Sequence, residues 1–131
     1  MVHKEDPTRP IDHASGWFDQ NSGDFRSVHN YFRPLKVELE DKRAFVISEY
    51  GGYACHVAGH SSVDRIFGYQ RYDSCEELSA AYQKLMDTQL LLLEQKGLAG
   101  AVYTQLSDIE EEVNGLVTYD RRVVKVKPAE K

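Results

Sequence analysis

The sequence predicts an α/β fold in which parallel strands pack against one long helix. A short apolar run rich in β-branched residues at 44–48 is typical of a strand buried on both faces. A helical pattern follows at 75–96, and a second apolar run at 98–104 indicates another buried strand. A strand, a helix and a strand in this order form a βαβ unit, whose two strands are parallel.

The helix carries signals at both ends. Ser74 and Glu77 are spaced as a capping box, in which each side chain accepts a hydrogen bond from the other residue's backbone N–H. Gly97 stands where a left-handed residue would end the helix. One mostly apolar face is predicted between them, formed by Leu78, Tyr82, Leu85, Gln89, Leu92 and Leu93.

The rest of the chain is less regular. Residues 6–10 contain two prolines and predict a loop that leads into a short strand at 11–15. Residues 16–24 predict a second loop, and residues 25–32 predict a strand that Pro34 ends. Residues 35–43 have room for a short helix at most. The glycine-containing stretch at 50–73 predicts a long loop, and loops of this length are usually functional.

Composition excludes several classes of function. The 131 residues suit one soluble domain, and the formal net charge of −5 argues against nucleic acid and anionic membranes as partners. No apolar run approaches the roughly 20 residues of a membrane span, and the N-terminus lacks the apolar core of a signal peptide. The sequence therefore does not predict the cellular compartment of the protein. Cys55 and Cys75 could pair, although two cysteines favour free thiols. No cofactor is expected, because the sequence contains no glycine-rich phosphate motif.

Polar and aromatic residues follow each of the predicted strands. The three strand ends read His29-Asn30-Tyr31, Ser48-Glu49-Tyr50 and Tyr103-Thr104-Gln105. The carboxyl ends of parallel strands meet at one edge of a sheet, where ligands bind in α/β folds. We therefore expect a site at this edge. Taken alone, Glu49 could also be half of a structural ion pair or a loop cap, because a carboxylate there must be paired or hydrogen-bonded.

Residues 45–52, with Glu49 among them, resemble the nucleophile strand of glycoside hydrolase family 2, which includes β-galactosidases, β-glucuronidases and β-mannosidases. Four other segments resemble the same family in the same order, so that the resemblance covers nearly the whole chain; they are 6–10, 24–31, 100–108 and 114–122. The resemblance implies a partial TIM (β/α)8 barrel over residues 1–131, with about the last four strands and one long helix, in a single domain.

The resemblance also implies roles for particular residues. Glu49 would be the nucleophile of a retaining enzyme, and Tyr31 would hydrogen-bond it. His29, Asn30, Tyr103 and Gln105 would contact the carbohydrate substrate, with Tyr103 at a position that is commonly Trp in the family. Other interpretations remain open: Tyr31 could be a core residue, His29 a structural histidine and Tyr103 a plug in the barrel.

A second carboxylate is the missing part. Retaining glycosidases need two carboxyl groups about 5–5.5 Å apart. The family's acid/base lies in an Asn-Glu pair, and this sequence contains none. We therefore expect a fragment that is inactive alone and whose parent hydrolyses β-glycosides. The rival sources of the second carboxylate are Asp24, Asp108 and Glu110.

Three further expectations concern surfaces and partners. Open sheet edges invite pairing, so two copies could associate as a homo-oligomer. The acidic run at 110–112, together with Asp108, suits a solvated or helix-starting segment.

His56 and His60 are spaced like metal ligands on a helix, but the glycines and serines around them disfavour a helix, so no metal site is expected. The alternatives to a hydrolase fragment are a non-catalytic sugar-binding module and a plain structural domain.

Overall fold

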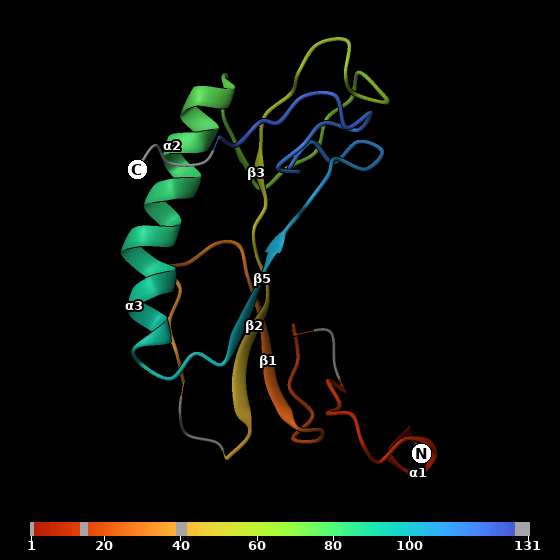
Figure 1. The fold of residues 1–131 in the computed structure, drawn as a ribbon, viewed down its shortest axis with the longest axis vertical. Helices are drawn as coiled ribbons and strands as arrows, with labels where there is room; N and C mark the ends of the chain where they lie inside the picture. The colour runs from red at the N-terminus through yellow and green to blue at the C-terminus, as the bar shows by residue number, and fades with distance from the viewer. Residues whose placement is uncertain (1, 14–15, 39–41, 128–131) are drawn as a thin grey trace.

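A three-stranded parallel sheet is the centre of the fold. The computed structural model describes residues 2–13, 16–38 and 42–127. The strand order is β1-β2-β5, with β1 at Phe25–Asn30, β2 at Ala44–Gly51 and β5 at Gly100–Thr104. Both strand pairs are parallel, so the α/β class and the parallel βαβ arrangement are confirmed. The long helical segment runs along one side of this sheet (Figure 1).

The predicted helix consists of three consecutive elements. They are α2 (Cys75–Leu85), the π-helical turn η1 (Met86–Leu90) and α3 (Leu91–Glu94). At the N-terminus, the Glu77 N–H donates to Ser74 Oγ over 3.1 Å, but the Glu77 carboxylate accepts from the N–H of Asp73, so only half of the predicted capping box forms. At the C-terminus, the N–H groups of Gly97 and Leu98 donate to Glu94 and Leu93, with Gly97 at φ 96°, which is a Schellman ending.

The hydrophobic core lies between the sheet and this helical segment. Strand β2 contributes Phe45, Ile47 and Tyr50, which are at most 3% exposed. The helical segment contributes the buried side chains of Leu85, Leu90 and Leu93. The core therefore fixes which face of β2 points toward the helix and which face remains for a site.

A smaller unit continues from the carboxyl end of the sheet. Strands β3 (Tyr53–Ala54) and β4 (Gln70–Arg71) form a parallel pair, so the stretch at 50–73 is not entirely loop. The C-terminal segment, blue in Figure 1, lies beside β3. It is held there by Lys125, whose fully buried ammonium donates to Asp108 Oδ1 at 2.6 Å and to the carbonyls of Cys55 and Val113.

The N-terminal region differs most from the prediction. No strand forms at residues 11–13, and residues 14–15 lie outside the described part. Among the described residues, Ile11 instead bonds only to Asp24, through its N–H to Asp24 Oδ2 and through its carbonyl to the Asp24 N–H. One pair of bonds anchors a loop but makes no ladder. A short helix, α1 (Val2–Glu5), was not predicted.

Two expectations about helices concern a short helix at 35–43 and a membrane-spanning helix. No helix forms at 35–38 or 42–43, and residues 39–41 lie outside the described part. Within the described ranges, no helix is both long and apolar enough to span a bilayer.

Candidate active site

Glu49 lies near the carboxyl end of β2, on the face of the sheet opposite the helix. Phe45 and Ile47 point into the core, and simple alternation would send Glu49 there as well. The register with β1 shifts at this point, from Val28 opposite Ile47 to His29 opposite Glu49. The extra residue is Ser48. This bulge returns Tyr50 to the core and turns Glu49 to the other face, as bulges beside active sites often do.

Tyr31 is the main partner of Glu49. Its hydroxyl oxygen lies 2.7 Å from Glu49 Oε2 and 2.8 Å from Thr104 Oγ1. A phenol has one proton to donate, so Tyr31 donates to the carboxylate and accepts from Thr104. Burial, followed by the bond to Glu49, raises the pKa of Tyr31 well above its usual range, while Thr104 opposes this shift. Tyr31 is therefore a neutral donor that links the ends of all three strands.

His29 lies on the other side of the same carboxylate. Its Nδ1 is 3.3 Å from Glu49 Oε2, and its side chain is 7% exposed. This buried nitrogen makes no hydrogen bond to any of the described residues. The edge of Trp17 packs on the imidazole at 5.3 Å. Gly16 allows this approach, because a Cβ there would meet His29 Cδ2 at 2.2 Å.

Aromatic rings surround the Tyr31–Glu49 pair. Tyr69, from the segment before β4, stacks on Tyr31 with ring centroids 3.8 Å apart, and Phe32 packs edge-on against both rings. Gly52, at φ 62°, leaves room for this stack, because a Cβ there would lie 2.5 Å from the Tyr69 ring. Trp17 and Phe32 are 48% and 72% exposed, so apolar ring faces border the site.

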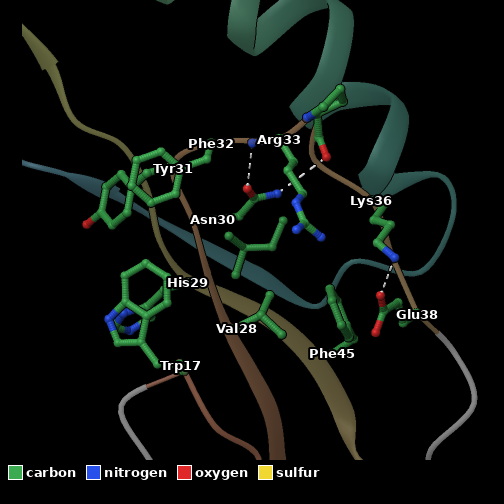
Figure 2. Close-up of a pocket in the computed structure, with 13 residues that line it drawn as sticks. Trp17, Val28, His29, Asn30, Tyr31, Phe32, Arg33, Lys36, Glu38 and Phe45 are labelled. Atoms are coloured by element: carbon green, nitrogen blue, oxygen red, sulfur yellow. Dashed lines mark hydrogen bonds and ion pairs between the residues drawn. The ribbon is translucent and has the colours of Figure 1, made fainter. Parts of the chain in front are cut away.

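A cavity of about 450 Å³ adjoins the site along β1. Figure 2 shows Trp17, His29 and Tyr31 along one side of it and Lys36, Glu38 and Phe45 along the other, with Val28 between them. Glu49 does not line this cavity. The cavity therefore lies beside the carboxylate, separated from it by His29 and Tyr31.

Three predicted substrate contacts are not brought to Glu49. Asn30 closes the turn after β1, with its amide bonded to the Pro34 carbonyl and to the Arg33 N–H (Figure 2). Tyr103 faces the helix, packed on Tyr50, Tyr53 and Tyr82, and its ring lies against Gly51. Strand alternation explains where Tyr103 lies, since the neighbouring Thr104 is then the residue on the side of Glu49.

The third of these residues, Gln105, belongs to a separate network. Its side-chain N–H groups donate to Glu112 Oε2 at 3.0 Å and to Asn114 Oδ1 at 2.7 Å. Asn114 is fully buried and also donates to Glu112. The expectation of a solvated acidic run is therefore wrong for Glu112. It is also wrong for Asp108, which is 3% exposed, whereas Glu110 and Glu111 are exposed.

None of the three residues considered as a second catalytic carboxylate is paired with Glu49 in the described part. Asp108 is paired with Lys125, Asp24 accepts from the Ile11 N–H, and Glu110 is exposed at a left-handed φ of 51°. The side chains in contact with Glu49 in the described part are Tyr31 and His29, and neither is a carboxylic acid. His60 pairs with Asp120 at 2.8 Å, and the described residues contain no cluster of metal ligands.

Residues that sequence reasoning missed are Trp17, Tyr69 and Thr104. Thr104 had a usable signal, because alternation along a strand allows only one of Tyr103 and Thr104 to face the site. Trp17 and Tyr69 lie in loops, whose paths carry no periodic signal. No protein-family model matches the chain, and no curated protein matches it.

Proposed function

We propose that this chain is the nucleophile-bearing part of a retaining, β-galactosidase-like glycoside hydrolase that cleaves O-glycosidic bonds. The observation that carries the proposal is the hydrogen bond from Tyr31 to Glu49, made where neighbouring parallel strands end. A neutral phenol beside a carboxylate holds the carboxylate in one orientation and stabilises its negative charge. This arrangement suits a nucleophile more than a structural ion pair, because no Lys or Arg of the described residues lies within ion-pair distance of Glu49.

The two carboxylate oxygens have different surroundings. Oε2 accepts from Tyr31 and faces His29, whereas Oε1 has no hydrogen bond in the described part. Oε1 is therefore the atom that attacks the anomeric carbon, forming a covalent glycosyl-enzyme as the leaving oxygen departs. Tyr31 keeps Oε2 bonded during the attack, and water later releases the sugar. The side chain of Glu49 is 44% exposed, so a substrate can reach it.

The rings around Glu49 suit a carbohydrate. Sugars present apolar C–H faces, which stack on aromatic rings, and hydroxyl groups, which need polar partners. Trp17 and Tyr69 are partly exposed and supply ring surface, and the 44% exposed Glu49 side chain supplies polar atoms. The same rings also favour the second candidate function, a sugar-binding module that performs no chemistry.

The barrel and the acid/base belong to the same proposal. Strands β1, β2 and β5 would be the sixth, seventh and eighth strands of a (β/α)8 barrel, and the second carboxylate would come from another chain segment. The outer edges of β1 and β5 are where that segment, or a second copy of this chain, would pair. Sedimentation would count against self-association if it found a compact monomer at micromolar concentration.

Leaving-group dependence tests the proposed function. Dinitrophenolate departs without protonation, whereas a methoxyphenol needs a general acid. The chain is expected to release about one equivalent of dinitrophenolate from the matching β-galactoside, β-glucuronide or β-mannoside, and to leave the methoxyphenyl glycosides intact. Binding without any release would support the sugar-binding module, and comparable release from both leaving groups would show that an acid lies within this chain.

The Tyr31→Phe variant is expected to slow this release by about 10–100-fold, because it removes one hydrogen bond to a charged group. Thr104→Val is the matched control. It keeps the side-chain shape and removes only the bond to Tyr31, so a smaller effect is expected. Burst kinetics would measure both, and an unchanged rate in Tyr31→Phe would contradict the role given to the phenol.

A further inference from the structure

The two cysteines approach each other across the smaller unit. Cys55 follows β3 and is 2% exposed, whereas Cys75, the first residue of α2, is partly exposed. Their sulfur atoms are 4.0 Å apart, which is van der Waals contact between two thiols. A disulfide would need the two sulfurs to close to about 2 Å, a movement that side-chain rotation can supply when the backbones are already near.

Backbone bonds hold the two cysteines in place. The Cys55 N–H donates to the Val113 carbonyl at 2.9 Å, and its own carbonyl accepts from Lys125 at 3.0 Å. Near Cys75, the Tyr72 N–H donates to the Ala54 carbonyl at 2.8 Å, next to the β3–β4 pairing. The Cys55 end is therefore held by the C-terminal segment, and the chain just before Cys75 is held by the small sheet. The contact between the thiols follows from this anchoring.

We propose that Cys75 and Cys55 form a thiol-modification site at which a low-molecular-weight disulfide of the glutathione class closes a Cys55–Cys75 disulfide. Cys75 reacts first because it is the partly exposed thiol. Its thiolate attacks one sulfur of glutathione disulfide, and one glutathione leaves as thiolate. Cys55 then loses its proton to solvent and attacks the Cys75 sulfur, releasing the second glutathione. Two protein thiols are oxidised, and one glutathione disulfide is reduced to two thiols.

Burial supports this order of steps. It raises the pKa of the Cys55 thiol to about 11, with the neighbouring Cys75 adding to the shift. A buried thiol of this kind is a poor first attacker but can resolve a mixed disulfide held beside it, because the reaction is then intramolecular.

The disulfide would constrain the loop that carries Tyr69. Residues 55–75 include Tyr69, whose N–H donates to the Gly52 carbonyl at 3.2 Å and whose ring stacks on Tyr31. Closing the loop removes conformational freedom mainly from the unfolded chain. It would therefore stabilise the part of the fold that holds Tyr69 without adding a contact to Glu49.

The proposal is tested by measuring the effective concentration of one cysteine thiol at the other. The reduced chain would be equilibrated with glutathione and glutathione disulfide, once folded and once in denaturing urea, and the cross-link measured by intact mass and peptide mapping. The folded chain should favour the intramolecular disulfide by about 100-fold over the unfolded chain, and its unfolding midpoint should rise by roughly 10 °C on oxidation. An equal or lower preference in the folded chain, or cross-linking between chains, would overturn the proposal.

Single substitutions separate the two steps. Cys55→Ser should retain one glutathione on Cys75, because no thiol is left to release it. Cys75→Ser should remain unmodified while folded, because Cys55 is buried. If Cys75→Ser were modified as readily as Cys55→Ser, the assigned order would be wrong. Glu49→Gln should cross-link like the wild-type chain, so this test is independent of the proposed hydrolase function.

Discussion

Replacement of Glu49 by glutamine is expected to abolish covalent capture of a sugar by this chain. A 2-deoxy-2-fluoro glycoside with a dinitrophenolate leaving group forms a glycosyl-enzyme that breaks down slowly, so one glycosyl group should remain on wild-type Glu49. Glutamine keeps the shape of the side chain and can still accept from Tyr31, but its amide oxygen is a much weaker nucleophile. The rate of capture should fall by at least roughly 10⁴-fold, as for other catalytic nucleophiles.

The control for this experiment is Glu112→Gln. Glu112 is the carboxylate that accepts hydrogen bonds from Gln105 and Asn114, and in the described part Glu49 bonds instead to Tyr31. Its removal should leave capture intact. Peptide mass mapping should place the sugar on the peptide that contains Glu49. Labelling of Glu112 or Asp24 instead, or labelling of Glu49→Gln at the wild-type rate, would refute the assignment of the nucleophile.

Most of the central fold was predictable from the sequence because it depends on local patterns. The apolar run at 44–48 became part of β2, and the pattern at 75–96 became the helical segment ended by Gly97. Both are long or strongly apolar, and burial of such segments follows from their periodicity. The predicted strand at 11–15 was weak by the same measure. In the described part, residues 11–13 pair with no strand, and Ile11 bonds only to Asp24.

The site was predictable only in part, for two physical reasons. The position of Glu49 depends on the register shift at Ser48, and a bulge leaves no periodic trace in a single strand. We expected Tyr103 near Glu49, but Thr104 lies there instead. Which of the two residues faces the site depends on which face of β5 packs on the helix, and the packing of Tyr103 against Tyr50 and Tyr82 decides this orientation. Tyr69 reaches Tyr31 through a loop whose path depends on long-range bonds.

Replacement of Lys125 by methionine should strongly destabilise the fold, because it removes one partner of a fully buried ion pair. The Lys125 and Asp108 side chains are 0% and 1% exposed, and their ion pair is 2.6 Å long. Methionine fills much of the same volume but leaves the Asp108 carboxylate buried without its cation. Removing one partner of a buried pair costs about 3–5 kcal/mol. Urea unfolding at neutral pH would measure the loss.

The pH dependence of that loss distinguishes charge from packing. Burial raises the pKa of Asp108 above its ordinary value, although Lys125 opposes the shift. A carboxyl group with a raised folded pKa binds more protons in the folded state, so its contribution to stability falls as pH rises from the ordinary value through the folded pKa. In Lys125→Met the main interaction that opposes the shift is gone, although the Gly115 N–H still donates to Asp108, so the cost should be smaller near pH 4 than near pH 7. Adding Asp108→Asn to this variant should recover much of the loss at pH 7. An equal cost at both pH values, with no recovery in the double variant, would mean that packing around Lys125, and not its charge, holds the C-terminal segment against β3.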